Sequence, residues 1–203
     1  MQLFEVLRSR REITRFLDRP IPPQVVEPIV EAAYLSPTGN NLPSRELVIV
    51  TDRETLSRLA GATPYVQWLA EAAAAVVVTG LPEVSKYWLQ DASIASGFIW
   101  LAAVDLGLGA AYGAIYHSQD AETSESREHY VRNILDIPGD RRIVAILGLG
   151  YPQTPPPKKE KYPPEAVIYY GRFGQTRPPL RIEGRTPAPT TSAPGVPAWE
   201  QSP

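Results

Sequence analysis

The chain has 203 residues, of which 43% are hydrophobic and 21% charged, and its formal net charge is -2. This length and composition are typical of a globular protein with a hydrophobic core, and the near-neutral charge gives no general attraction to nucleic acid or to an anionic membrane. The absence of cysteine excludes disulfides, thiolate metal sites and cysteine nucleophiles, and is compatible with a cytoplasmic protein.

The N-terminal half of the chain predicts helices that alternate with strands. Residues 3–7 favour a first helix that runs into a basic cluster. Ile21-Pro22-Pro23 is a helix-start signal, and apolar residues then recur at helical spacing as far as residue 34. Dense turn chemistry follows at residues 36–41. We expect strands at 47–50 and 74–79, with a short helix at 53–60 that Asp52 caps between them.

The C-terminal half continues the same mixed order. Residues 87–106 predict a long helix that is apolar on nearly every face, so we expect it to be buried in a core or across a subunit interface. Gly107 would end that helix. Strands are expected at 110–116 and 142–149, a helix at 125–135, and a short final strand at 165–170. Without a strict strand–helix–strand repeat, the order indicates an α+β domain.

Proline gathers in residues 152–164 and again in a tail from 176 to 203. The tail has too little apolar surface to offset the entropy of ordering it, so we expect residues 175–203 to be disordered or to form an extended arm. Residues 1–174 would then form the folded domain. The N-terminus lacks the pattern of a secretory signal, and no run approaches the roughly 18 apolar residues of a membrane span, so we expect a cytoplasmic location.

Several familiar motifs are absent from the sequence. The glycine-rich run 107–113 follows a helix and precedes a strand, the reverse of a dinucleotide-binding turn, and Tyr112 stands where the third glycine belongs. His117 and His129 are the only histidines and have no zinc-site spacing, so we expect no metal. No nucleophile elbow and no phosphate-binding P-loop sequence occurs.

Two basic sets remain as candidates for chemistry. Arginine and lysine on defined turns suit a phosphate monoester, although solvated charged surfaces are the alternative interpretation. The sets are Arg8, Arg10 and Arg11 near the N-terminus, and Lys158, Lys159 and Lys161 after the proline-rich turn.

Taken in order, four segments resemble motifs of the nitroreductase family of flavoproteins. Residues 9–16, SRREITRF, resemble the family's S-R-R-S-I-R-x-F, and residues 36–42, SPTGNNL, resemble its A-P-S-x-x-N-L. Residues 87–91 and 101–109 resemble its central helix and the turn that ends it. Residues 149–152, together with Lys159-x-Lys161-x-Pro163, resemble the last of the family's motifs, G-Y-P…K-x-R-x-P. The matches span roughly residues 3–173.

The resemblance implies an α+β fold with a central, mostly antiparallel sheet surrounded by helices, an intertwined homodimer, and FMN at each subunit interface. The phosphate would lie between Arg10, Arg11 and the pair Lys159 and Lys161. Loop residues from the opposite subunit and a strand of small residues would contact the rest of the flavin. The implied cofactor-binding residues are Arg10, Arg11, Glu12, Thr14, Pro37, Thr38, Gly39, Asn41, Gln67, Ala110, Ala111, Tyr112, Gly113, Lys159 and Lys161.

Three departures from the family pattern affect the flavin. Glu12 replaces a serine and would repel a phosphate unless it is turned away or paired. Thr14 replaces a cation near the flavin's pyrimidine edge, a role that Arg15 could take instead. In the loop, Pro43-Ser44-Arg45 replaces Q-P-W.

The resemblance implies an oxidoreductase in which hydride passes from NADH or NADPH through the flavin to a nitroaromatic, a quinone or a similar electron-poor acceptor, in a ping-pong cycle. The flavin would carry the chemistry, so no side chain is expected as an obligatory acid or base. Glu12 and Thr14 favour an alternative, a flavin-binding or sensor protein of the same fold with little turnover. A further alternative makes the proline-rich tail an interaction arm, swapped onto the partner subunit or docked on a polyproline-binding domain.

Overall fold

The core of the fold is a four-stranded antiparallel sheet with strand order β1-β2-β4-β3. In the computed structural model, which describes residues 2–155 and 161–176, the strands are β1 (Arg45–Val50), β2 (Ala74–Gly80), β3 (Gly109–Ala114) and β4 (Arg142–Gly150). The two central strands, β2 and β4, are almost continuous apolar runs because helices cover both faces of the sheet. The expected α+β class with an antiparallel sheet is confirmed.

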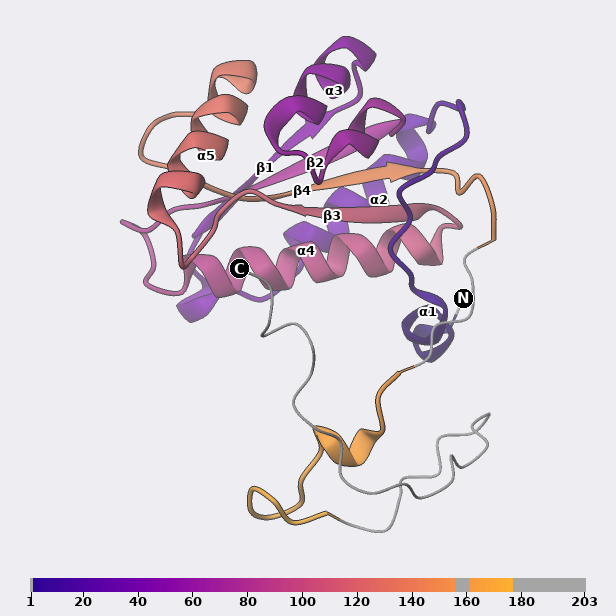
Figure 1. Cartoon of the computed structure of the whole chain (residues 1–203), viewed down its shortest axis with the longest axis vertical. Helices are drawn as coiled ribbons and strands as arrows, with labels where there is room; N and C mark the ends of the chain where they lie inside the picture. Colours follow the sequence, from indigo (N-terminus) through magenta and orange to yellow (C-terminus); the bar gives the residue numbers. More distant parts are fainter. Residues whose placement is uncertain (1, 156–160, 177–203) are drawn as a thin grey trace. The chain divides into compact units, whose positions relative to one another are not determined.

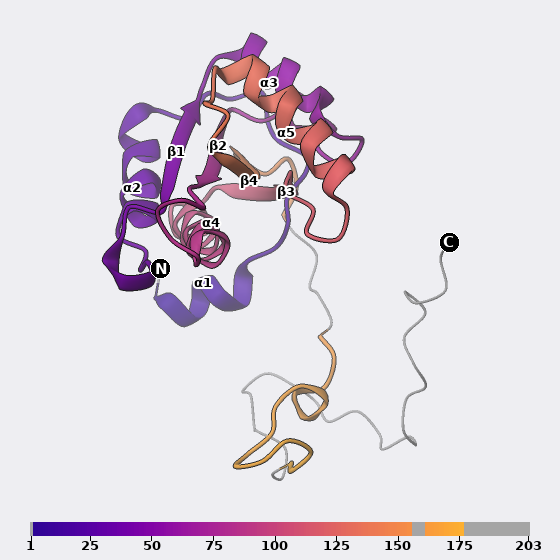
Figure 2. The same ribbon diagram turned by 90° about the vertical axis from the view of Figure 1, so that its left-hand side faces the viewer.

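Helices pack on both faces of the sheet (Figure 1). On one face lie α2 (Pro23–Tyr34) and α4 (Trp88–Asp105), which share a core with β2 and β4 through Ile29 and Ile99. On the opposite face, α3 (Arg53–Leu59) and α5 (Ala121–Leu135) form a second core around Leu59 and Val131 (Figure 2). The first helix, α1 (Leu3–Ser9), packs against α4.

The segment that follows α1 crosses one end of the sheet. The backbone N–H of Leu17 donates to the Tyr151 carbonyl oxygen at 2.8 Å, and the N–H of Gln153 donates to the Arg15 carbonyl oxygen at 3.1 Å. Phe16 is buried and forms a β-bridge with Pro152. These bonds hold residues 15–17 beside the chain that leaves β4.

The helix boundaries largely follow the predicted signals. Asp52 caps α3 by accepting a hydrogen bond from the Thr55 N–H at 2.8 Å, and Gly107 adopts a positive φ of 78° just after α4. Asp120 caps α5 in the same way as Asp52, and this cap starts the helix at Ala121, earlier than expected. None of the helices in the described part of the chain is long and apolar enough to cross a membrane.

The chain divides into two compact units, Met1–Lys158 and Lys159–Pro203. In the second unit, the predicted strand at 165–170 is wrong, because Pro163 and Pro164 set the backbone for a 3₁₀ turn, Pro164–Ala166. The predicted tail, 175–203, lies almost entirely outside the described residues, so its character and the predicted boundary at residue 174 stay predictions.

Candidate functional site

Residues 10–14, which carry the first predicted basic set, lie along the outer edge of β3. The backbone N–H of Ile13 donates to the Ala110 carbonyl oxygen at 3.0 Å, and Glu12 and Ala110 form a parallel β-bridge. A methyl group added to Gly109 would lie 2.7 Å from the Ile13 side chain, so glycine permits this close approach. The structure therefore brings two predicted site segments together.

A stack of three side chains joins this segment to the helix layer. The Arg10 guanidinium lies 4.5 Å from the centre of the Trp100 ring, which comes from α4. The Trp100 ring stacks in turn on Tyr112 of β3, with centroids 6.3 Å apart and planes 4° from parallel. Burial raises the pKa of Tyr112, which keeps its phenol neutral. The stack fixes Arg10 beside the edge of β3.

The two neighbours of Arg10 are also held in defined positions. The Arg11 guanidinium donates to the carbonyl oxygens of Arg8 and Arg10, at 2.9 and 2.7 Å. The Glu12 carboxylate accepts a hydrogen bond from the Tyr112 backbone N–H at 3.4 Å. The carboxylate expected to repel a phosphate thus has a backbone partner on β3, although its negative charge remains next to Arg11 in the chain.

Thr14 and Arg15, which follow this segment, are both exposed. The Arg15 guanidinium pairs with the Glu71 carboxylate at 2.7 Å, and both side chains are open to solvent. Arg15, the cation that could take the role of the one replaced by Thr14, is therefore paired with Glu71 at the surface.

Ala111, Gly113 and Gln67 belong to the opposite face of the sheet. Successive side chains of β3 alternate, so Ala111 and Gly113 point away from the Trp100 stack. A methyl group on Gly113 would meet Val66 and Trp68, the residues on either side of exposed Gln67. Only the backbone of Ala111 and Gly113 is therefore shared with the site that Arg10, Ala110 and Tyr112 form.

The predicted loop that contains Pro37, Thr38, Gly39 and Asn41 is held at the other end of α4. The Gly39 backbone N–H donates to the Asp91 carboxylate at 2.9 Å. Asp91 and Trp100 are roughly 13 Å apart along the helix axis, at about 1.5 Å per residue. In one chain the loop and the basic segment are therefore anchored at separate points along α4.

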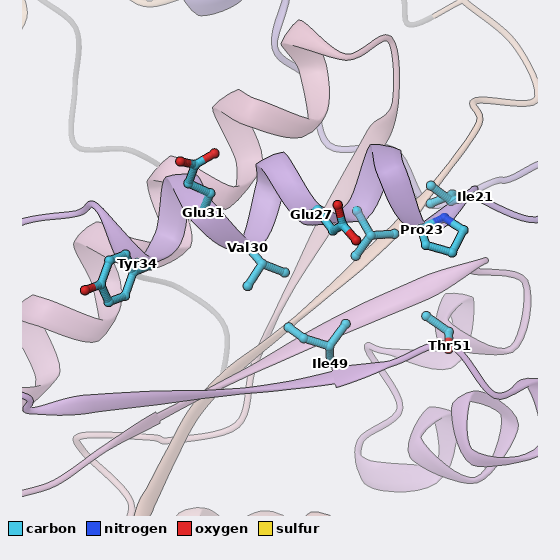
Figure 3. Close-up of a pocket in the computed structure, with 9 residues that line it drawn as sticks. Ile21, Pro23, Glu27, Val30, Glu31, Tyr34, Ile49 and Thr51 are labelled. Atoms are coloured by element: carbon cyan, nitrogen blue, oxygen red, sulfur yellow. The ribbon is translucent and has the colours of Figure 1, made fainter.

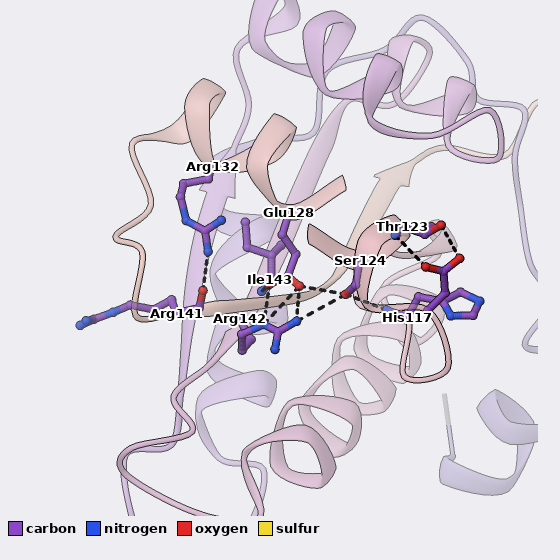
Figure 4. A network of polar contacts seen from close by, with 9 residues as sticks. His117, Thr123, Ser124, Glu128, Arg132, Arg141, Arg142 and Ile143 are labelled. Carbon is purple, nitrogen blue, oxygen red and sulfur yellow. Dashed lines mark hydrogen bonds and ion pairs between the residues drawn. The ribbon is translucent and has the colours of Figure 1, made fainter. Parts of the chain in front are cut away.

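A polar network supports the chain just beyond β3 (Figure 4). Buried Glu128 of α5 accepts hydrogen bonds from the Arg142 guanidinium, at 2.6 Å, and from the hydroxyl of Ser124, at 2.9 Å. The Ser124 hydroxyl oxygen also accepts a bond from the His117 backbone N–H at 3.0 Å. Burial alone would raise the pKa of Glu128, but these bonds and one from the Ile143 N–H hold that pKa below its usual range.

Two depressions flank α2. One, of about 650 Å³, is lined by the predicted loop residues Pro37, Thr38 and Asn41 and by Arg45. The other, of about 750 Å³, lies between α2 and the edge strand β1, where the side chains of Val30 and Ile49 point into the gap (Figure 3). The second depression contains none of the predicted site residues.

The second predicted basic set is not placed beside the first. Lys159 lies outside the described residues, and Lys161 belongs to the second compact unit. Their role in binding a phosphate stays a prediction.

Sequence reasoning missed two residues that organise the site. Trp100 lies in the predicted buried helix, where an aromatic residue with a polar N–H is a signal that it needs a partner. Asp91 lies in the first turn of the same helix, where a buried carboxylate requires hydrogen-bond donors. Neither signal names the partner, since the partners are distant in sequence.

Comparisons with known proteins indicate the family and the fold of the chain. The profile described as "Nitroreductase family" matches residues 7–80. A protein of Archaeoglobus fulgidus, named as a candidate NADH dehydrogenase/NAD(P)H nitroreductase, is 34% identical over 75% of this chain and 86% of its own length. A crystal structure from Bacteroides thetaiotaomicron with the same name is 30% identical, with a TM-score of 0.77 over 84% of this chain and 98% of that one. The structure of an FMN-dependent nitroreductase from Clostridium difficile is 25% identical, with a TM-score of 0.76 over 84% of this chain and 99% of that one.

Proposed function

The chain belongs to the nitroreductase family, and on that premise we propose that it is an FMN-dependent oxidoreductase that passes hydride from NADH or NADPH to a nitroaromatic, a quinone or a similar electron-poor acceptor. The observation that carries the proposal is that Trp100 holds two arginines at the β3 edge. Its ring lies against the Arg10 guanidinium and stacks on Tyr112, and its indole N–H donates to the Arg11 carbonyl oxygen. The similar structure from Clostridium difficile, an FMN-dependent nitroreductase, supports the choice of cofactor.

The chemistry of the residues around β3 fits FMN. Arg10 and Arg11 supply guanidinium donors suited to a phosphate monoester. Ala110, on the same face of β3 as Tyr112, has only a methyl side chain, so a flat ring system can approach the strand backbone closely. Lys159 and Lys161 would add charge at the phosphate, and Thr38 and Asn41 would add polar contacts from the loop.

Two copies of the chain would complete the site, so we include a homodimer in the proposal. In one chain the loop and the basic segment are held at different points along α4. Between those points α4 exposes Ile94 and Phe98, which are 40% and 39% accessible, and α1 exposes Leu3 and Phe4. An apolar face of this kind is typical of a subunit interface. Pairing two copies through it would place the loop of one chain near the arginines of the other.

The residues of this chain would act by binding and orientation. When bound, FMN would supply the chemistry of accepting a hydride from the nicotinamide donor and passing it to the acceptor. Arg10 and Arg11 would hold the phosphate, the loop would orient the ring system, and the apolar subunit interface would exclude water. We assign no side chain as an obligatory acid or base.

Initial-rate kinetics test the function. The rate is measured with varied NADH or NADPH against several fixed concentrations of a quinone and then of a nitroaromatic compound. Parallel double-reciprocal lines are expected, because donor and acceptor would react in separate halves of a ping-pong cycle. Tight FMN binding without turnover of either donor would instead support the alternative, a flavin-binding or sensor protein, and would overturn the enzyme proposal.

A further inference from the structure

We propose that Asp91 is a positioning residue that fixes the loop from Ser36 to Ser44 in the conformation that contacts the flavin. The assignment rests on the proposed FMN function, because it concerns the loop that would orient the ring system. Asp91 would touch neither the flavin nor a substrate, and would act only through the loop.

The Asp91 carboxylate binds the loop at two points. It lies in the first turn of α4 and is only 3% exposed. One oxygen accepts the Gly39 backbone N–H at 2.9 Å, and the other accepts the hydroxyl of buried Ser44 at 2.5 Å. A buried carboxylate is unfavourable unless donors satisfy it, so these two bonds couple the burial of Asp91 to one loop geometry.

Arg45 holds the start of the same loop. Its guanidinium donates to the backbone carbonyl oxygens of Ala33 and Ser36, at 2.8 and 2.7 Å. Burial lowers the pKa of Arg45, while the negative charge of Asp91 acts in the opposite direction. The carboxylate therefore stabilises the loop through Gly39 and Ser44, and electrostatically through Arg45.

The backbone of the loop needs such support. Asn40 and Asn41 have φ angles of 56° and 55°, in the left-handed region that L-residues other than asparagine and aspartate rarely adopt. A methyl group on Gly39 would lie 2.5 Å from the Tyr87 ring, so the loop rests directly on the residue that precedes α4. The side chain of Asn41 is exposed on this tethered loop, where it is available to a ligand.

Substitutions that test the assignment differ in how many of the bonds between Asp91 and the loop they remove. Asp91→Ala loses both bonds to the loop, and Ser44→Ala loses one. Asp91→Asn can keep both, since its amide oxygen can accept the Gly39 N–H while its NH₂ donates to Ser44 Oγ. Ser96→Ala is the matched control. Ser96 is a buried residue of α4 whose hydroxyl donates to the Ala92 carbonyl oxygen within the same helix, so this variant loses a buried hydroxyl without removing a bond between Asp91 and the loop.

The test combines FMN affinity, from quenching of flavin fluorescence, with hydrogen–deuterium exchange of residues 36–44 in the protein without flavin. We expect Asp91→Ala to exchange faster in the loop and to weaken FMN binding at least about tenfold, in line with the loss of hydrogen bonds to a charged group. Ser44→Ala should be intermediate, and Ser96→Ala should stay close to wild type. Asp91→Asn can keep both bonds but loses the charge that acts on Arg45, so it should bind FMN more weakly than wild type and more tightly than Asp91→Ala. If Asp91→Ala does not fold, the comparison of Ser44→Ala with Ser96→Ala tests the assignment, because only Ser44→Ala removes a bond to Asp91.

The outcomes separate the two proposals. Wild-type protein that binds no FMN overturns the proposed function, and the flavin role of Asp91 with it. If the wild-type protein binds FMN, two results would overturn the Asp91 assignment alone. One is that Asp91→Ala or Ser44→Ala binds FMN as tightly as wild type. The other is that Ser96→Ala weakens FMN binding as much as these two variants do.

Discussion

The indole N–H of Trp100 donates a hydrogen bond to the backbone carbonyl oxygen of Arg11 at 3.2 Å. The same ring lies against the Arg10 guanidinium. One side chain of α4 therefore orients two consecutive arginines, through a hydrogen bond to the backbone of one and a cation–π contact with the other. Because these arginines are the proposed phosphate ligands, we expect substitutions of Trp100 to lower the affinity for FMN.

Substituting Trp100 should weaken FMN more than riboflavin, which lacks the phosphate. Trp100→Phe keeps an aromatic ring but loses the N–H, so we expect FMN to bind a few-fold more weakly. Trp100→Leu loses both contacts and should have the larger effect. Fluorescence titrations with both flavins measure this, and an equal loss of affinity for FMN and riboflavin would contradict a role at the phosphate.

Replacing Glu12 should strengthen FMN binding. A carboxylate beside the phosphate-binding arginines repels a phosphate, so Glu12→Ser is expected to tighten FMN about three- to tenfold and to leave riboflavin almost unchanged. Glu12 is exposed, so the gain should shrink as salt screens the charge. Glu12→Gln removes the same charge at nearly the same size and serves as the control. A gain with serine but none with glutamine would show that charge is not the cause.

A charge on the exposed face of α4 should separate the proposed dimer. Phe98→Glu places a carboxylate in the centre of the apolar face, so we expect a monomer with little bound FMN. Mass in solution is measured by light scattering after size exclusion, together with flavin content. Ser126→Glu is the matched control, because Ser126 is an exposed position of α5 on the other face of the sheet, and this variant should remain a dimer. A Phe98→Glu protein that stays dimeric with full flavin would exclude this interface.

Stability should fall in acid through Glu128. Its pKa is lower in the folded protein than its ordinary value of about 4.3, so the folded state favours the charged form. Its contribution to the free energy of unfolding is complete above that ordinary value and is lost as the pH falls through the folded pKa. Glu128→Gln should therefore lower the free energy of unfolding by about 1–3 kcal/mol near neutral pH.

The check is urea unfolding at several pH values between 3 and 7. The difference in stability between wild type and Glu128→Gln should narrow steadily toward the acid end. A difference that is the same across the whole range would mean that Glu128 does not titrate as proposed.

The sequence predicted the strands and helices of residues 2–155 well because their signals are local. The continuous apolar runs of β2 and β4 indicate central strands, and Asp52 and Gly107 mark helix ends by their own chemistry. The final strand at 165–170 was wrong because its β-forming residues follow two prolines that set a 3₁₀ turn.

The candidate site was predictable only as separate pieces. The sequence indicated Arg10, Arg11 and the loop around Gly39 by their resemblance to family motifs. It did not indicate that Trp100 holds the first piece and Asp91 the second, since those contacts join residues far apart in the chain. The alternation of side chains along a strand does place Ala111 and Gly113 on the opposite face from Tyr112, but the sequence did not indicate which of the two faces Arg10 and Trp100 cover.

The central claim is that the protein binds FMN and reduces it with a nicotinamide donor. The most direct measurement is the visible spectrum of the purified protein, supplemented with FMN if it is colourless, before and after NADH or NADPH is added without oxygen. We predict the absorbance of oxidised flavin, bleached within seconds by at least one donor. A protein that takes up no FMN, or a bound flavin that stays oxidised with both donors, would contradict the claim.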